Sequence, residues 1–272
     1  MIWIGRAGAR RRMLWETRAA GVVWRREILR CLRNPAQVAL VLSQPLIYLV
    51  VLGTGLGSLI PDAPPVGDYR TYLFPGVLVM TVYLPAVATG VSIAIDRETG
   101  FLREMLVAPV HRASLLAGRC AGGTTVAACQ GALVLALAGV ARLPYDPALL
   151  ATLAAELTLI AFTLTTLVTL LAVSVGRRQT LHAVLGFTIT PMIFLSGALF
   201  PVSGLPSWLA GLALANPLTY VIDPLRQTIA PYLNGRASMT AGQPAAVREL
   251  AVTAVVGLLA LLLAARRMAR AG

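Results

Sequence analysis

The 272-residue chain has no lysine, so all 23 of its basic residues are arginine. A phosphate-binding P-loop requires a lysine at the β- and γ-phosphates, and a Schiff-base enzyme requires a lysine amine. Both chemistries are therefore excluded for this chain. If ATP drives its activity, another polypeptide must bind the nucleotide.

Residues typical of metal sites and catalysis are scarce as well. Cys31, Cys120 and Cys129 form an odd set, which we interpret as small buried apolar residues rather than disulfide partners. The two histidines, His111 and His182, have no metal-binding spacing around them. No Gly-x-Ser-x-Gly elbow or carboxylate pair is found at membrane depth. We therefore expect no metal site, no cofactor and no covalent catalysis in this chain.

Charged residues make up only 12% of the chain, against 57% hydrophobic residues and a mean hydropathy of +0.77. Soluble proteins have about 25% charged residues, so this composition predicts an integral membrane protein. The formal charge of +12 comes from arginines near the ends of apolar stretches. Because membrane topology requires arginines in such places, they argue against nucleic-acid binding.

About 20 apolar residues are needed to cross roughly 30 Å of hydrocarbon, so the apolar stretches between charges predict membrane spans. The chain has six, which predicts a single all-α transmembrane domain over residues 1–272. They are residues 37–57, 71–95, 120–141, 157–176, 183–202 and 247–265. Their interiors lack Asp, Glu, Lys, Arg and His. A proton-driven transporter would therefore lack its usual coupling groups.

The arginines orient these spans. Eighteen of the 23 lie before the first span, in residues 96–119, at positions 177 and 178, and after the last span. The positive-inside rule predicts that this side is cytoplasmic. Both termini would then lie on the cytoplasmic side of the membrane, which we expect to be a bacterial cell membrane. One alternative stays open, in which residues 179–222 form two spans and the C-terminal arginines lie outside.

Residues 14–33 predict an amphipathic helix in the cytoplasmic interface, held by acyl contacts and anionic headgroups. Its apolar face carries Trp24, Ile28, Leu29 and Leu32, and its polar face carries Arg25, Arg26, Glu27, Arg30 and Arg33. The alternative is a solvated basic tail, in which Trp15 and Trp24 would be unfavourable.

Residues 96–119 combine four arginines, three carboxylates and a histidine between two predicted spans. These charges cannot lie in hydrocarbon, so we expect a loop with helical content at one membrane face that contacts another molecule. The residues expected to make that contact are Asp96, Arg97, Glu98, Thr99, Gly100, Phe101, Leu102, Arg103, Glu104, Met105, Leu106 and Pro109. The alternative is an ordinary solvated loop, which leaves the four apolar residues unexplained.

Residues 203–233 follow the fifth predicted span and are broken by glycine and proline, which predicts a re-entrant segment on the outer side. A short helix is expected at residues 205–210 and another at 223–232. The motif between and within them is formed by Asn216, Pro217, Tyr220, Asp223 and Arg226.

These motifs, in this order, resemble the membrane subunit of type 2 ABC exporters, in the branch of daunorubicin-resistance-like and nodulation-export-like permeases. The similar segments are residues 96–110, Phe74-Pro75-Gly76, residues 194–201 and residues 216–226. The resemblance implies that two six-span subunits, identical or homologous, pair with two cytoplasmic ATPases, which bind the ATP and Mg²⁺. Residues 96–109 would then form the coupling helix, with charged residues pairing across the ATPase interface and apolar residues anchoring it.

The resemblance also implies export of a hydrophobic or amphipathic substrate, such as a drug-like molecule, a lipid or a glycolipid. We expect the pathway at the dimer interface, lined by the first, second and fifth spans. Two other functions stay open: a secondary transporter or channel that acts without an ATPase, and a membrane scaffold that transports nothing.

Overall fold

The computed structural model describes residues 6–59, 69–99, 112–175, 177–200, 206–233 and 244–270, and all statements below refer to these residues. Every regular element in them is helical. The elements are α1 (Arg6–Leu32), α2 (Pro35–Ile47), η1 (Tyr48–Leu52), α3 (Gly53–Leu59), α4 (Tyr69–Glu98), α6 (Arg112–Leu135), η2 (Ala138–Ala141), α7 (Pro147–Val175), α8 (Arg178–Leu195), α9 (Ser207–Ala215), α10 (Thr219–Leu233) and α11 (Pro244–Arg270).

Four stretches of the described chain are long and apolar enough to cross a membrane. They are Pro35–Gly57, Tyr69–Glu98, Pro147–Val175 and Ala246–Ala269. The first runs through α2, η1 and α3 without a break, and its π-helical turn η1 begins three residues after Pro45. A proline inside a helix removes one backbone N–H, which favours such local rearrangement. The all-α membrane architecture is thus confirmed, and the six-span count stays a prediction.

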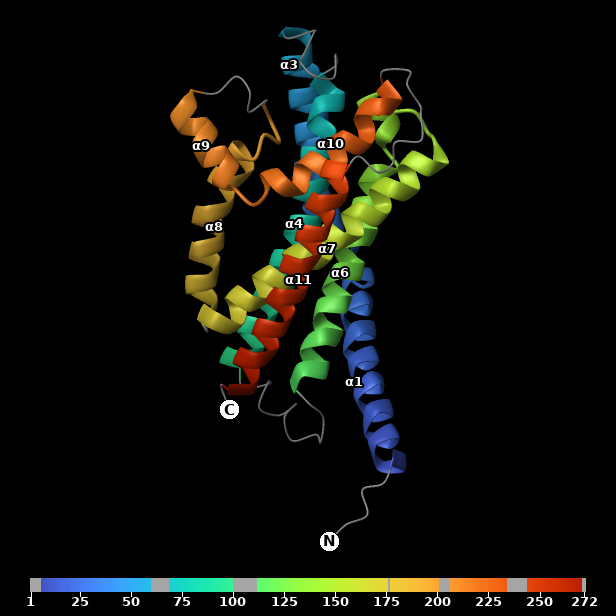
Figure 1. Cartoon of the computed structure of the whole chain (residues 1–272), viewed down its shortest axis with the longest axis vertical. Coiled ribbons are helices and arrows are strands. Elements are labelled where there is room, and N and C mark those ends of the chain that lie inside the picture. The colour runs from blue at the N-terminus through green and yellow to red at the C-terminus, as the bar shows by residue number, and fades with distance from the viewer. Residues whose placement is uncertain are drawn as a thin grey trace.

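The helices form a bundle in which α7 packs against α4, α6 and α11 (Figure 1). α1 packs along α6, α8 packs at the opposite edge against α4 and α7, and α10 crosses the bundle near the start of α4. The core is apolar, with Phe74 and Leu78 of α4 facing Leu153 and Leu157 of α7 in one buried cluster.

Small residues set the close helix contacts, as is common where lipid gives no hydrophobic drive between helices. A Cβ at Gly90 of α4 would lie 2.5 Å from Val168 Cγ1 of α7. A Cβ at Gly123 of α6 would lie 2.4 Å from Thr89 Oγ1 of α4. These approaches bring backbone and hydroxyl groups of different helices together in the middle of the bundle.

The predicted fourth span began at residue 157, but α7 begins ten residues earlier, at Pro147. Asp146 caps this start, because its Oδ1 accepts hydrogen bonds from the backbone nitrogens of Ala148 (2.7 Å) and Leu149 (3.3 Å). Glu156 therefore lies inside a helix that can span the membrane, and it is only 6% exposed. The start of the fourth span at residue 157 stays a prediction, and Glu156 lies on the same continuous helix.

The predicted faces of the interfacial helix also need one correction. Glu27 was placed among the arginines of the polar face, but it is buried against α6. Gly118 and Gly122 of α6 make this possible, since a Cβ at Gly118 would lie 2.4 Å from the carbonyl oxygen of Ala20 and one at Gly122 2.8 Å from Glu27 Cβ. Most of the other named residues of both faces are exposed; Leu29 and Leu32 are among them.

Candidate functional site

The long helix α4 carries a cluster of polar contacts at each end. The cluster at its C-terminal end is centred on Arg119 of α6, which is 5% exposed. The Arg119 Nη2 atom bonds to Asp96 Oδ2 of α4, and its Nε lies 3.7 Å from Glu27 Oε1 of α1. We call Glu27, Asp96 and Arg119 the buried triad. It ties α1, α4 and α6 together through charges that are largely removed from water.

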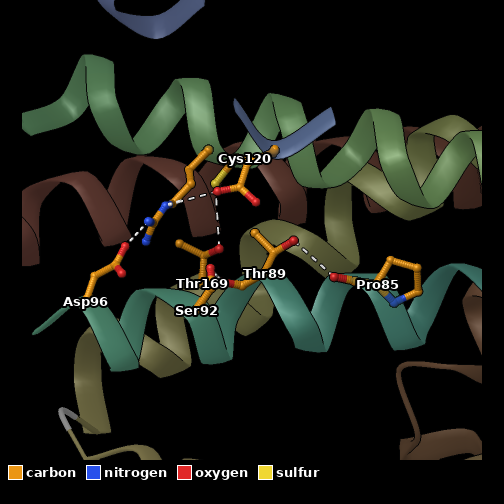
Figure 2. A network of polar contacts seen from close by, with 8 residues as sticks. Pro85, Thr89, Ser92, Asp96, Cys120 and Thr169 are labelled. Carbon is orange, nitrogen blue, oxygen red and sulfur yellow. Dashed lines mark hydrogen bonds and ion pairs between the residues drawn. The ribbon is translucent and has the colours of Figure 1, made fainter. Parts of the chain in front are cut away.

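Polar side chains continue from the buried triad along α4. Thr89, Ser92 and Asp96 follow one another along this helix and lie near Cys120 of α6, as Figure 2 shows. The Thr89 hydroxyl donates to the Pro85 carbonyl (3.0 Å), and the Ser92 hydroxyl donates to the Thr89 carbonyl (2.8 Å). Since both hydroxyls donate within their own helix, what they offer to the space around them is oxygen lone pairs.

Two further charged residues link the end of α4 to the junction between α7 and α8. Arg97 Nη1 donates to the Val173 carbonyl (2.7 Å) in the last turn of α7. Glu98 Oε1 accepts a hydrogen bond from the backbone nitrogen of Arg178 (2.7 Å), the first residue of α8. A cation at a helix C-terminus and an anion at a helix N-terminus both match the helix dipole and satisfy end groups that lack partners. The end of α4 is thus bonded to α6, α7 and α8, and through Arg119 it is linked to α1.

The residues predicted to contact another molecule are only partly described. Asp96, Arg97 and Glu98 bind the chain's own helices, and the Thr99 hydroxyl donates to the Ile95 carbonyl (3.0 Å) of its own helix. Gly100, Phe101, Leu102, Arg103, Glu104, Met105, Leu106 and Pro109 lie outside the described residues. Their predicted contact with a partner stays a prediction.

The cluster at the N-terminal end of α4 is built on aromatic residues. Tyr72 donates a hydrogen bond to the Gly197 carbonyl (2.7 Å), and Tyr69 donates one to the Leu199 carbonyl (2.8 Å). Arg226 of α10 bonds to the same Gly197 carbonyl and lies over the Tyr72 ring, with its Cζ 4.1 Å from the ring centre. Gly197 has a φ of 74°, a conformation that side chains disfavour. The cluster therefore fixes the chain where it turns after α8.

The predicted outer motif forms the joint between α9 and α10. Asn216 Nδ2 donates to the Met192 carbonyl of α8 (2.6 Å), and Asn216 Oδ1 accepts from the backbone nitrogen of Leu218 (3.1 Å). The hydroxyl of Tyr220 donates to the Leu214 carbonyl (2.9 Å). Pro217 lies in the turn between the two helices, and Asp223 Oδ1 lies 3.9 Å from Arg226 Nη1. Burial raises the pKa of the Asp223 carboxyl, and the nearby Arg226 partly counteracts this.

Two cavities between the described helices adjoin α4. One, of about 400 Å³, is lined by the end of α1, the start of α2, α4, α6 and His182 of α8. The other, of about 100 Å³, lies between α2 and η1, α4, and α8, where Tyr48, Tyr83 and Phe194 line it. The second cavity thus touches the three spans that were predicted to line the pathway.

Comparison with known proteins identifies the family. Residues 18–230 match the family described as ABC-2 type transporter. The chain belongs to this family. It is 30% identical over 213 residues to a putative transport permease, ycf38, of Cyanophora paradoxa, covering 75% of this chain and 72% of that protein. It is 32% identical over 216 residues to nodulation protein J of Rhizobium leguminosarum bv. viciae, covering 76% and 80%.

A third relative is the inner membrane transport permease YadH of Escherichia coli strain K12. It is 28% identical over 211 residues, which cover 75% of this chain and 80% of YadH. The chain is therefore a membrane permease subunit of an ABC exporter, and within such a transporter it is the non-catalytic transport component. The resemblance drawn from the sequence motifs is confirmed.

Several residues of this ABC-2 permease that carry its polar clusters were not identified from the sequence. Arg119 was counted as one of the loop charges, although Gly118 and Gly122 on either side of it indicate a close helix contact. Tyr72 lies two residues before the motif Phe74-Pro75-Gly76 and is not part of it. Glu156 lies one residue before the predicted fourth span, and in the structure its Oε1 accepts a hydrogen bond from the Thr228 hydroxyl of α10 (2.7 Å).

Proposed function

We propose that this permease works with a separate ABC ATPase that binds ATP and Mg²⁺, and that residues 96–109 form the contact through which ATP hydrolysis drives export. An ATPase partner is general to the ABC-2 family. The observation that carries the proposal is the bonding at the end of α4. Arg97 and Glu98 join it to α7 and α8, and Asp96 joins it through Arg119 to α6 and α1. A displacement of the neighbouring loop would therefore be passed to four helices.

We further propose six spans with both termini in the cytoplasm. α6 and α8 are the two additional spans, because α6 packs against α4, α7 and α11 and α8 packs against α4 and α7. The beginning of α1 and the end of α11 lie at the same end of the bundle as the end of α4 (Figure 1), which supports an even number of crossings. Reporter fusions at each end should both report a cytoplasmic location. An extracytoplasmic C-terminus would overturn this topology.

The functional unit is proposed to be a dimer of this chain, or of this chain with a homologous permease, with the pathway at the interface. Apolar side chains are exposed on both helices that flank the smaller cavity. Ile47, Val50 and Val51 are exposed on α2 and η1, and Phe187, which is 84% exposed, lies on α8. The cargo is proposed to be a hydrophobic or amphipathic molecule, because the lining is mostly apolar with few polar groups.

The coupling contact is tested with the ATPase encoded beside this permease. The two proteins are co-purified in nanodiscs, and ATPase activity is measured for the parent and for Glu98→Arg and Gly100→Pro. Both variants should insert into the membrane but lose most of the permease-dependent ATPase stimulation. Gly211→Ala, at a position on α9 where an added Cβ meets nothing within 4 Å, is the control and should stimulate normally. Full stimulation and transport by Glu98→Arg and Gly100→Pro would refute the coupling role of this segment.

Glu156 supports a second candidate, a proton-coupled transporter that needs no ATPase. Ionisable residues inside membrane spans often belong to proton pathways, and Glu156 is buried inside α7. Its carboxylate is bonded to Thr228. Flux into proteoliposomes without ATP that disappears in Glu156→Gln would favour this candidate. Export that requires the ATPase and persists in Glu156→Gln would exclude it.

A further inference from the structure

The larger cavity has apolar walls and a polar buried end. Its volume of about 400 Å³ lies in the range of small-molecule sites. Val38 and Val41 of α2 and Leu84 and Val87 of α4 form much of the wall. Of these four residues, only Leu84 also lines the smaller cavity between α2, α4 and α8. The larger cavity is therefore distinct from the smaller one.

Two buried oxygen atoms at the polar end have no hydrogen-bond donor among the described residues. Glu27 Oε1 accepts no hydrogen bond, because its nearest cation, Arg119 Nε, lies 3.7 Å away. Gln130 Oε1 has no donor either, while its Nε2 lies 3.9 Å from Cys31 Sγ. Glu27 is 8% exposed and Gln130 5% exposed, and both line the cavity. Buried acceptors without partners are unfavourable, so these oxygens call for a donor inside the cavity.

The Glu27 carboxylate at this end has only a distant cation. Arg119 gives its hydrogen bond to Asp96 and lies 3.7 Å from Glu27 Oε1, while Arg30, the arginine that lines the cavity, is exposed. A buried carboxylate without a closely paired cation is costly. Water in the cavity can satisfy acceptor oxygens, but it carries no charge. A cation with N–H groups satisfies both demands at once.

We propose that this cavity binds the primary ammonium group of an amphipathic molecule. The ammonium donates its three hydrogen bonds to oxygens of Glu27, Gln130 and Ser92, and the hydrocarbon part lies against the apolar wall. Arg30 and His182 line the exposed rim, where a phosphate beside the ammonium would lie in an aminophospholipid. The inference rests on the proposed export function. It names the chemistry of a molecule that this permease takes up from the cytoplasmic half of the membrane.

The chain contains its own probe for this site. Cys31 lines the cavity and is partly exposed, Cys120 is buried and Cys129 is exposed. In a Cys129→Ser background, the rate at which N-ethylmaleimide alkylates Cys31 reports whether the cavity is filled. The full-length permease in nanodiscs is treated with N-ethylmaleimide in the presence of dodecylamine, dodecanol or dodecyltrimethylammonium. Alkylation of Cys31 is followed by mass spectrometry. Dodecylamine should slow the labelling in a saturable way, and the other two, which lack the charge or the N–H donors, should protect at least tenfold more weakly.

Two variants test the assigned residues, and a third is a control. Glu27→Gln removes the charge at nearly constant volume, and Gln130→Met removes the amide oxygen and is a second test should Glu27→Gln fail to fold. Each should weaken protection by dodecylamine by about tenfold, as expected when a charge-assisted hydrogen bond is lost. Glu16→Gln, a carboxylate on α1 that does not line the cavity, is the matched control and should protect like the parent. The proposal would be overturned if dodecanol protected Cys31 as well as dodecylamine does, or if dodecylamine gave no saturable protection. It would also be overturned if dodecylamine protected the Glu27→Gln variant as strongly as the parent.

Two lysolipids distinguish an aminophospholipid headgroup from a free amine as the source of the ammonium group. Protection by lysophosphatidylethanolamine but not by lysophosphatidylcholine, whose nitrogen has no hydrogen, assigns the site to an aminophospholipid headgroup. Protection by dodecylamine alone assigns it to a free amine, and both results support the proposal. The labelling needs no ATPase, so a permease that binds the amine but fails to stimulate its ATPase contradicts the proposed coupling and leaves this site intact.

Discussion

Replacement of Arg119 by methionine tests the buried triad most directly. Methionine fills a similar volume but cannot pair with a carboxylate, so Glu27 and Asp96 would lose their shared cation in a site where their side chains are 9% and 14% exposed. Breaking a buried ion pair by removing one partner typically costs about 3–5 kcal/mol. Chains of roughly this size lose about 2–4 °C of melting temperature per kcal/mol, so we expect a decrease of roughly 6–20 °C.

The apparent melting temperature is measured in detergent by heating the protein and following the monodisperse fraction by size-exclusion chromatography. A second variant separates lost charge pairing from lost packing. When Arg119→Met is combined with Glu27→Gln and Asp96→Asn, no unpaired charge remains, and most of the melting temperature should return. Arg33→Met, at an exposed position of α1, controls for the loss of one arginine and should change stability by about 0.5 kcal/mol or less. A melting temperature of Arg119→Met within about 2 °C of the parent, which by the same relation is less than about 1 kcal/mol, would refute the assignment of these residues as a buried charge cluster.

Three further predictions concern the same measurement. Tyr72→Phe should cost about 1 kcal/mol, because the Gly197 carbonyl keeps its bond to Arg226. Gly123→Ala should cost about 1–3 kcal/mol, because its Cβ would meet Thr89 Oγ1 at 2.4 Å, whereas Gly211→Ala meets nothing within 4 Å and should not destabilise. Thr228→Val should cost about 1–3 kcal/mol by leaving the Glu156 carboxylate unpaired, and Glu156→Gln, which keeps an acceptor oxygen, should cost less. The reverse order of these last two variants would contradict a hydrogen-bonding role for Glu156.

The helical membrane fold was largely predictable from composition and spacing. Apolar stretches bounded by arginines gave the positions of most long helices, because crossing hydrocarbon requires about 20 apolar residues. The ends of the helices were less predictable. α7 extends to Pro147 because Asp146 caps it, and α4 extends through Glu98 because its last residues bond to α6, α7 and α8. Rules based on charge end a span at the first ionisable residue, whereas a helix ends where its last backbone groups find other partners.

The polar clusters were less accessible to sequence reasoning. A charge is expected to lie in water, so Glu27 was placed on an exposed face and Arg119 in a loop. Their burial depends on a pairing between residues 92 positions apart and on the small residues that let α1 approach α6. Helical periodicity describes one helix at a time and carries no information about such pairs. The glycines beside Arg119 were the available signal, since small residues on a membrane helix indicate close packing.

The two polar clusters also explain why one helix matters most for the proposed coupling. At 1.5 Å per residue, α4 is about 45 Å long, and it is bonded near both of its ends. Between them, Gly90 lies against α7 and Thr89 against Gly123 of α6, so closely that neither glycine has room for a Cβ. We expect a force applied after Thr99 to tilt α4 together with these neighbours. The tilt would change the contacts of Tyr72 with Arg226 at the opposite end, where the chain turns after α8. On this reasoning the charged segment and the aromatic cluster are two ends of one mechanical element, and weakening either should uncouple ATP hydrolysis from export.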